Sequence, residues 1–245
     1  PIAASTLAPV RLADVATRSA ETRAALFTAA ETLSAQLDRA CDAGVATDVD
    51  PALDERLRRD GAKLAAITTP LLATTDAARA APLRALGLLL AGDSTAGTVA
   101  RDAASDQPSD RGIMWILGEA LLRSNDAKER AEGFAILRDL APIDAVLRDR
   151  FWWRAQAAML ETLAVEAARG SAREDARGDT RRVADLVARA NRLATIDAEL
   201  GGPDIARRIE AARRKVKTPQ NSGGKPGGLN GGPNGGPNVG PNDGV

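Results

Sequence analysis

Residues 114–142 read MWILGEALLRSNDAKERAEGFAILRDLAP, and this stretch decides the fold. Its first half carries large apolar residues and one glycine at helical spacing, namely Met114, Leu117, Gly118 and Leu121. Phe134 follows in the second half, and Pro142 closes the stretch 24 residues after Gly118. A glycine allows a second helix to approach closely, and a proline ends a helix because it has no amide hydrogen. The stretch therefore predicts a hairpin of two helices, which needs neighbours to bury its apolar face.

The same spacing occurs again on both sides of this hairpin. In the preceding copy, the first-helix residues lie 31 residues earlier and are Leu83, Leu86, Gly87 and Leu90. The second-helix residues lie 34 residues earlier and are Ala96, Ala100 and Ala103 before Pro108, because about three residues are missing between the two helices. We expect Gly87, like Gly118, to lie against the second helix of its own hairpin. A third copy begins at Phe151-Trp152-Trp153. Its second helix is expected to start near Thr180, after a long exposed loop over the charged residues 168–179.

Over residues 78–216 this pattern resembles the tetratricopeptide family, whose 34-residue unit follows W-x2-L-G-x2-Y…A-x3-F…P. The resemblance covers 112–142 and 82–108, and more loosely 151–200. Arg130 and Leu137 depart from it, because the family has small residues there. The resemblance implies an all-α fold, a right-handed α-solenoid of about three helical hairpins over 78–217. Its first helices would line a concave groove.

Proteins of this family bind a partner protein or peptide in that groove, so the resemblance implies the same here. By helical phase the groove residues are Arg84, Leu88, Trp115, Glu119, Arg123 and Arg154. The arginines among them would form a lane for an acidic peptide or a C-terminal carboxylate. The alternative is ion pairing within a helix, such as Glu119 with Arg123. Trp115 follows Met114 and so cannot share its face, which turns Trp115 toward the groove or a neighbouring helix.

Residues 11–77 are expected to form a helical hairpin that precedes the repeats. Gaps of four and three residues place one apolar stripe on the first helix: Leu26, Ala30, Leu33, Leu37 and Ala40. Asp50-Pro51 starts the second helix, whose stripe is Leu53, Leu57, Leu64 and Ile67. Thr69-Pro70 and Ala81-Pro82 are two further expected helix starts. Cys41 is expected to be a small buried hydrophobic residue.

The two ends of the chain differ from the middle. Residues 1–10 are expected to be disordered, and so is the tail 218–245, in which GGPNGGPN has almost nothing to bury. Before the tail, a terminal helix carries Ile205, Ile209, Ala212 and Val216 on one face. Its other faces are rich in arginine, which predicts a solvated helix that caps the stack.

The composition excludes several function classes. The chain has no His, no Tyr and one Cys, so a triad with a His base, a His-ligated metal and an intramolecular disulfide are all excluded. We expect no enzyme, no metal and no small-molecule cofactor. The formal net charge is zero, which gives no general attraction to nucleic acid. No run approaches the ~20 apolar residues of a membrane span.

Two alternatives to a peptide-binding scaffold stay open. One is a structural or assembly subunit that self-associates through Ala/Leu helix faces. The other, weaker alternative is a nucleic-acid-binding module that uses a basic cluster, namely Arg207, Arg208, Arg213, Arg214, Lys215 and Lys217. Pro1 is compatible with removal of Met, with a cleaved signal or with a deleted upstream domain. The compartment therefore stays open, with the cytoplasm favoured.

Overall fold

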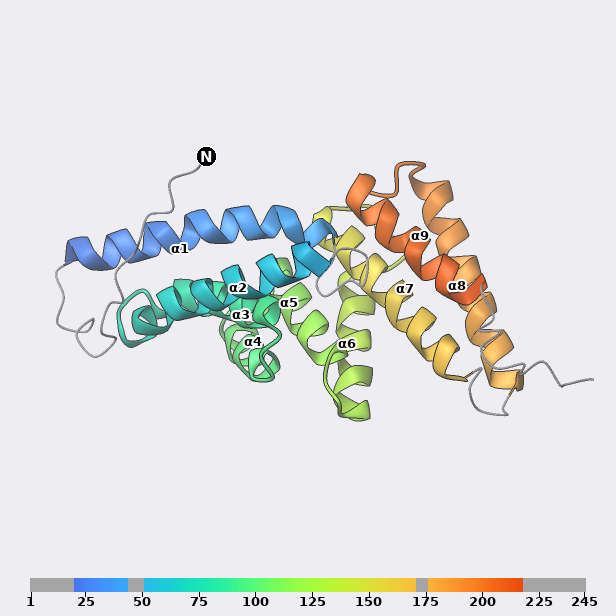
Figure 1. The fold of residues 1–245 in the computed structure, drawn as a ribbon, viewed down its shortest axis with the longest axis horizontal. Coiled ribbons are helices and arrows are strands. Elements are labelled where there is room, and N and C mark those ends of the chain that lie inside the picture. The colour runs from blue at the N-terminus through green and yellow to red at the C-terminus, as the bar shows by residue number, and fades with distance from the viewer. Residues whose placement is uncertain (1–19, 44–50, 171–175, 218–245) are drawn as a thin grey trace, which may run out of the picture.

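The computed structural model describes residues 20–43, 51–170 and 176–217, and within these ranges every regular element is a helix (Figure 1). The expected all-α class is confirmed. The predictions for residues 1–10 and 218–245 lie outside the described residues. The α-helices are α1 (Ala20–Ala40), α2 (Pro51–Thr68), α3 (Ala77–Ala91), α4 (Ala96–Asp106), α5 (Arg111–Leu122), α6 (Ala127–Leu140), α7 (Arg150–Gly170), α8 (Ala176–Ile196) and α9 (Pro203–Lys217). Two short 3-10 helices are η2 (Cys41–Ala43) and η3 (Thr69–Ala73).

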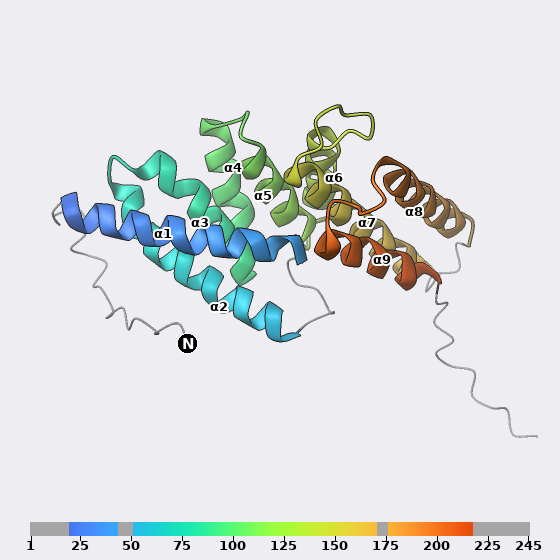
Figure 2. The same ribbon diagram turned by 90° about the horizontal axis from the view of Figure 1, so that it is seen from above.

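The helices are arranged in an elongated row (Figures 1 and 2). Each α-helix packs on the next one in the chain, and α5 also contacts both α3 and α7. The long helix α1 runs beside α2 and α3, and α9 packs against α7. One continuous apolar core runs through the row, from Leu37 in α1 to Ile209 in α9. The core therefore joins segments that are far apart in the sequence.

Apolar periodicity predicted many of the side chains that enter this core, while Leu26, Leu33, Leu53 and Ile67 of the expected stripes are partly buried and pack against core residues. In the expected stripes, Leu57 and Leu64 of α2 are buried, as are Ile205 and Ile209 of α9. The alanines expected at the same places in α4 are buried as well: Ala96, Ala100 and Ala103. Cys41 is fully buried, as expected. An α-helix repeats every 3.6 residues, so a stripe at this spacing faces one neighbour.

Close helix contacts depend on two pairs of glycines. A methyl group on Gly118 would lie 2.5 Å from Cδ2 of Leu137, and one on Gly133 would lie 2.7 Å from the Gly118 oxygen. Gly118 thus faces the second helix of its own hairpin, as predicted. The prediction for Gly87 is wrong, because Gly87 faces α2, where a methyl group would lie 2.6 Å from the Ala65 nitrogen. Helix α2 has Gly61 at this contact with α3. Because glycine has no Cβ, α2 can approach Gly87 more closely than α4 can.

The helix start expected at Ala81-Pro82 is also wrong, since α3 begins at Ala77 and contains Pro82. Proline has no amide hydrogen to donate to the carbonyl four residues before it, here that of Ala78. The side-chain amide of Gln107, just beyond α4, donates to this carbonyl at 2.9 Å. A residue from another helix thus replaces the missing donor. Thr69-Pro70 begins the 3-10 helix η3.

The loop expected over residues 168–179 is wrong at both of its ends. Helix α7 continues to Gly170 and α8 begins at Ala176, so only 171–175 lie outside the described residues. Alanine and arginine make up half of this stretch and are good helix formers, and this outweighs the turn signal of its two glycines. Beyond α8, Gly201 adopts φ +79° and passes directly beside the Trp153 ring.

Candidate functional site

The six residues expected in the groove lie on, or directly after, three helices that contact one another in order. Helix α3 carries Arg84 and Leu88, α5 carries Trp115 and Glu119 and is followed directly by Arg123, and α7 carries Arg154. We call the side of the row that these residues define the inner face. Four of them are almost wholly buried, with exposed fractions of 8% for Leu88, 1% for Trp115, 4% for Glu119 and 0% for Arg154. The expectation that these four line an open groove is therefore wrong.

The inner face is buried because the chain covers it with its own helices. Helix α1 contacts α3, α9 contacts α7, and η2 contacts α9. Arg84 and Arg123 keep part of their surface exposed, the Arg123 side chain to 28%. The covering helices come from the two ends of the described chain, so the spacing of the repeats alone did not indicate them.

Arg154 is the centre of the contact with α1 and η2. Its Nε donates to Oδ1 of Asp42 at 2.6 Å, and its Nη1 donates to Oδ1 of Asp38 at 2.7 Å. Its Nη2 donates to the backbone oxygen of Asp38 at 2.6 Å. Arg150, one turn earlier in α7, also pairs with Asp38. Arg154 was expected to await an acidic ligand, but the acidic groups come from this chain.

Two aromatic rings support the Arg154 guanidinium. Its central carbon lies 5.0 Å from the Trp115 ring centroid and 5.6 Å from that of Phe151. The two rings are themselves 6.3 Å apart. A cation over an aromatic face is attracted by the ring quadrupole, and more strongly so when both are desolvated. Trp115 therefore points at the neighbouring helix α7, which is one of the two orientations that its position predicts.

A second buried charge cluster lies where α9 crosses the inner face. Arg208 is only 3% exposed, and it donates to the two carboxylate oxygens of Glu161 at 2.9 and 2.8 Å. Its Nη2 also lies 3.5 Å from Glu119, which pairs with Arg123 at 3.7 Å. Burial by itself lowers the pKa of Arg208, but Glu161 and Glu119 outweigh it and raise that pKa. The expectation that all arginines of the terminal helix face solvent is wrong for Arg208.

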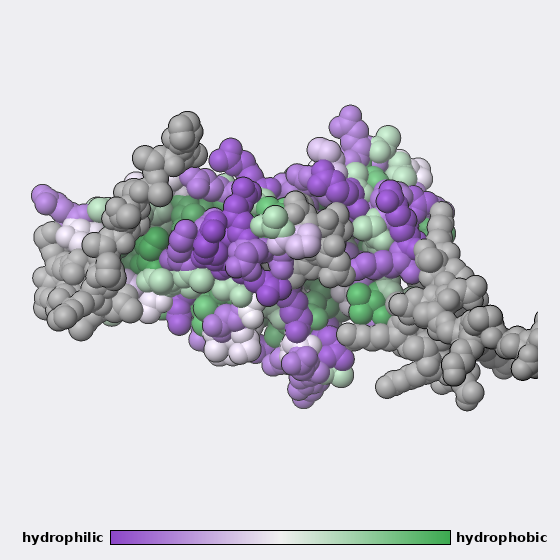
Figure 3. Space-filling model, viewed as in Figure 1, coloured by the Kyte–Doolittle hydropathy of each residue, from purple (hydrophilic) through white to green (hydrophobic). Residues whose placement is uncertain are grey.

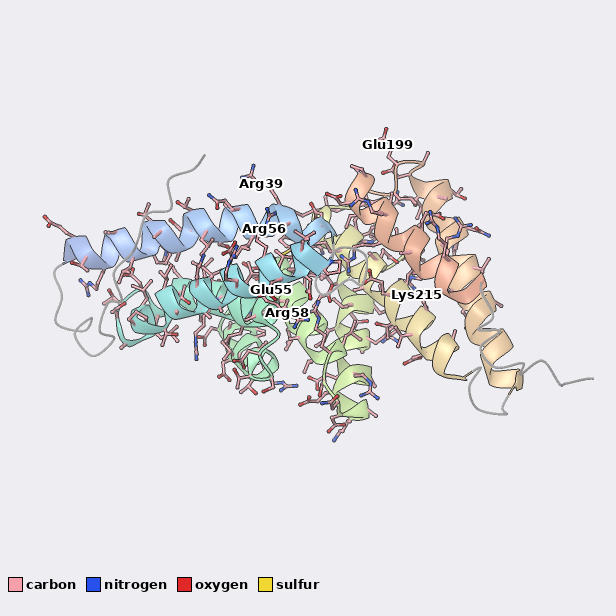
Figure 4. The ribbon with its side chains drawn as sticks, in the orientation of Figure 1. Arg39, Glu55, Arg56, Arg58, Glu199 and Lys215 are labelled. Atoms are coloured by element: carbon pink, nitrogen blue, oxygen red, sulfur yellow. The ribbon has the colours of Figure 1, made fainter. Side chains whose placement is uncertain are left out.

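Two further arginines of the basic cluster are paired. Arg207 pairs with Asp204 at 3.0 Å and Arg213 with Glu210 at 2.5 Å, both within α9. Figure 4 shows Lys215 on α9 and a mixed group of charges on α1 and α2, where Arg39 and Glu55 lie at the surface. Figure 3 shows hydrophilic and hydrophobic residues interspersed over this side of the molecule. Three arginines of the basic cluster, Arg207, Arg208 and Arg213, thus lie beside carboxylates of this chain.

The environment of the one thiol of the chain, Cys41, disfavours its reactive, deprotonated form. Burial raises the pKa of Cys41 to about 12, although the nearby Arg154 lowers it in part. A thiol of this kind stays protonated at neutral pH, and the nucleophilic form of cysteine is the thiolate. Among the described residues, no group of His, Cys, Asp and Glu has a metal-binding arrangement. None of the helices in the described ranges combines the length and apolar character of a membrane span.

Sequence reasoning missed Asp38, Asp42 and the burial of Arg208, although a signal existed for each. Asp38 and Asp42 are four residues apart, which places both carboxylates on one side of a helix. Arg208 falls between Ile205 and Ile209, within the apolar stripe of α9. No family model, curated protein or solved structure matches this chain.

Proposed function

We propose that this protein is a non-catalytic scaffold that binds a partner protein or peptide. In this proposal the hairpins α3–α4, α5–α6 and α7–α8 form a tetratricopeptide-like α-solenoid with the inner face as its concave groove. One observation carries the proposal: Arg154 on this face holds the acidic end of a helix through three hydrogen bonds. The face thus has the chemistry to bind a helical, acidic segment. In this chain the bound segment is the C-terminal end of α1 together with η2.

Arg84 and Arg123 supply the part of the inner face that a partner can reach. Both keep surface exposed, and Nε of Arg84 is buried without a hydrogen-bond partner among the described residues. A buried donor without an acceptor costs free energy, so an acidic group that accepts from it gains more than it would from a solvated donor. Arginine binds carboxylates in a planar, two-pronged geometry, which adds orientation to the attraction. We therefore place the partner beside these two arginines.

Photo-crosslinking in the source cells tests this function. A photoreactive phenylalanine replaces Arg84 or Arg123 in the tagged full chain, and Lys128, exposed on α6, is the matched control position. We expect a discrete adduct with a partner from positions 84 and 123 but not from 128. Adducts from position 128 alone, or from none of the three positions, contradict a partner on the inner face.

The two alternatives receive less support from the described residues. Self-association through Ala/Leu helix faces needs a continuous exposed apolar face, yet the exposed large apolar side chains in these ranges are Val146, Leu147 and Val165, and the first two lie outside any helix. Light scattering that gives the same monomer mass at all concentrations removes this alternative. A nucleic-acid module needs free arginines on α9, where Arg208 is instead buried and paired. Binding to DNA that weakens steeply with salt would restore it.

A further inference from the structure

Arg154 recognises more than an acidic charge. Besides the carboxylates of Asp38 and Asp42, it binds the backbone oxygen of Asp38. Asp38 lies in the last turn of α1, whose carbonyls have no partner within the helix. A cation is also favoured at this end, because the helix dipole is negative there. The three hydrogen bonds together therefore recognise the C-terminal end of a helix that carries two carboxylates four residues apart.

Residues of the row itself hold this recognition site in shape. Trp115 on α5 and Phe151 on α7 lie beside the guanidinium, and Arg150 reaches the same carboxylate of Asp38. Phe151 and Arg150 belong to the first turn of α7, which Asp149 caps by accepting from the amide of Trp152 at 2.9 Å. Asp149 is in turn bound by Arg111 of α5 at 2.7 Å. The arginine is thus positioned by α5 and α7 rather than by the helix that it binds.

The helix that occupies this site is attached to the row along one face. Of the 21 residues of α1, Phe27, Ala30 and Leu37 are buried, and Leu26, Leu33 and Ala40 are partly buried and pack against core residues. Buried apolar area is the main source of attachment for a packed helix. The charged contacts at the end of α1 add to this attachment, and they are the part that depends on acidic residues.

We propose that the Arg154 site is a docking site for the C-terminal end of a partner helix with two acidic residues four positions apart. Helix α1 with η2 is its built-in occupant, and a partner helix must displace it. The inference rests on the proposed function and names the partner's chemistry. An occupant on the same chain has an effective concentration of about 1 mM or more. The site thus selects partners that bind tightly or are locally abundant.

Cys41 provides a direct measurement of this displacement. It lies on η2, is fully buried, and is the one cysteine in the 245 residues. A thiol-reactive dye can therefore label Cys41 only when η2 separates from the rest of the protein or when the whole chain unfolds. The probe is a synthetic peptide of residues 20–43 with Cys41→Ser, added to the wild-type full chain. The control peptide additionally carries Asp38→Asn and Asp42→Asn.

The acidic peptide is expected to accelerate labelling by about tenfold at ten times its dissociation constant, because it traps the opened state. The control peptide is expected to leave the rate nearly unchanged. Equal effects of the two peptides, or none from either up to millimolar concentration, overturn the proposal. A wild-type rate that rises with protein concentration without peptide identifies a second copy as the occupant, and also overturns it.

Variants of the full chain separate local opening from unfolding. The double variant D38N/D42N is expected to be labelled about 100-fold faster than wild type, since it weakens a buried ion pair. Leu186→Ala removes a buried side chain of α8 without touching the site and is the matched control. Equal acceleration by L186A and D38N/D42N at equal loss of global stability overturns the proposal. Crosslinks from positions 84 and 123 would still support the proposed function, so the two failures are distinguishable.

Discussion

Gly61 and Gly87 face each other across α2 and α3, with a methyl group on either one only 2.8 Å from the carbonyl oxygen of the other. Contacts this short involve backbone atoms on both helices, so a rotamer change cannot relieve them. The two helices share the most extensive packing between any two described elements. A glycine in mid-helix costs about 1 kcal/mol relative to alanine. At this crossing the close packing offsets that cost.

Gly87→Ala is expected to destabilise the protein by about 1–3 kcal/mol, because the added methyl forces α2 and α3 apart. Gly97→Ala in α4 is the matched control, since its methyl meets Cδ2 of Leu121 at an ordinary 3.4 Å. There we expect no loss, or a gain of up to about 1 kcal/mol from helix propensity. Urea unfolding followed by circular dichroism measures both. Equal effects of the two substitutions would refute the role of this glycine pair.

Arg208→Ala is expected to cost about 3–5 kcal/mol, because it leaves Glu119 and Glu161 without their buried cation. The adjacent Arg207→Ala is the control. Arg207 is 60% exposed and, within the part of the chain that the structure describes, pairs with Asp204, so its removal should cost less than about 1 kcal/mol. Chemical denaturation of both variants tests this difference. A loss below 1 kcal/mol for Arg208→Ala would show that the buried cluster does not stabilise the fold.

Asp149 makes the stability of the fold sensitive to acid. Partial burial by itself raises the pKa of Asp149, but hydrogen bonds from Arg111 and from the Trp152 amide outweigh this and hold it below the usual 3.8. Its contribution is therefore complete above about pH 4 and is lost as the pH falls through the lowered pKa. Asp149→Asn should cost about 1–2 kcal/mol at pH 7, as for a lost helix cap.

The wild-type and Asp149→Asn unfolding curves should converge below pH 4, which thermal unfolding between pH 2 and 8 measures. Asp139→Asn, at a carboxylate 75% exposed, is the control and should follow the wild type at every pH. A difference between wild type and Asp149→Asn that stays constant down to pH 2 would contradict a pKa lowered by folding.

Cys41 makes the stability of the fold sensitive to high pH, in contrast to Asp149, which makes it sensitive to acid. Burial raises the pKa of Cys41 from 9.0 to about 12, so the folded state favours the neutral thiol. Its stabilisation is complete below pH 9 and is lost as the pH rises from 9 toward 12, by about 1 kcal/mol per pH unit. Urea unfolding between pH 7.5 and 10.5, with Cys41→Ala as reference, isolates this effect. Parallel stability curves for the two proteins would show that the thiol is accessible to water when folded.

The helices and the sides that they bury could be predicted from the sequence. Helix formation and apolar stripes are local properties, decided by residues three and four positions apart, so Leu57 and Leu64 or Ile205 and Ile209 indicated their buried faces directly. Five of the six residues that the same phase argument expected in the groove lie on the neighbouring helices α3, α5 and α7, and Arg123 directly follows α5. The spacing also indicated Gly118 as a close contact, because its hairpin partner follows within the next helix.

Whether the inner face is exposed or buried depends on contacts between segments that are far apart in the sequence. Arg154 and Asp38 are 116 residues apart, and Gln107 reaches the Ala78 carbonyl across 29 residues. No periodicity relates such pairs, since they meet when separate helices pack into one core. Only the tertiary structure therefore showed that α1 and η2 cover Arg154, that α9 brings Arg208 to Glu119, and that Gly87 packs against α2. Local spacing determines a helix and its buried side, whereas the neighbour on that side is chosen by the free energy of packing the whole chain.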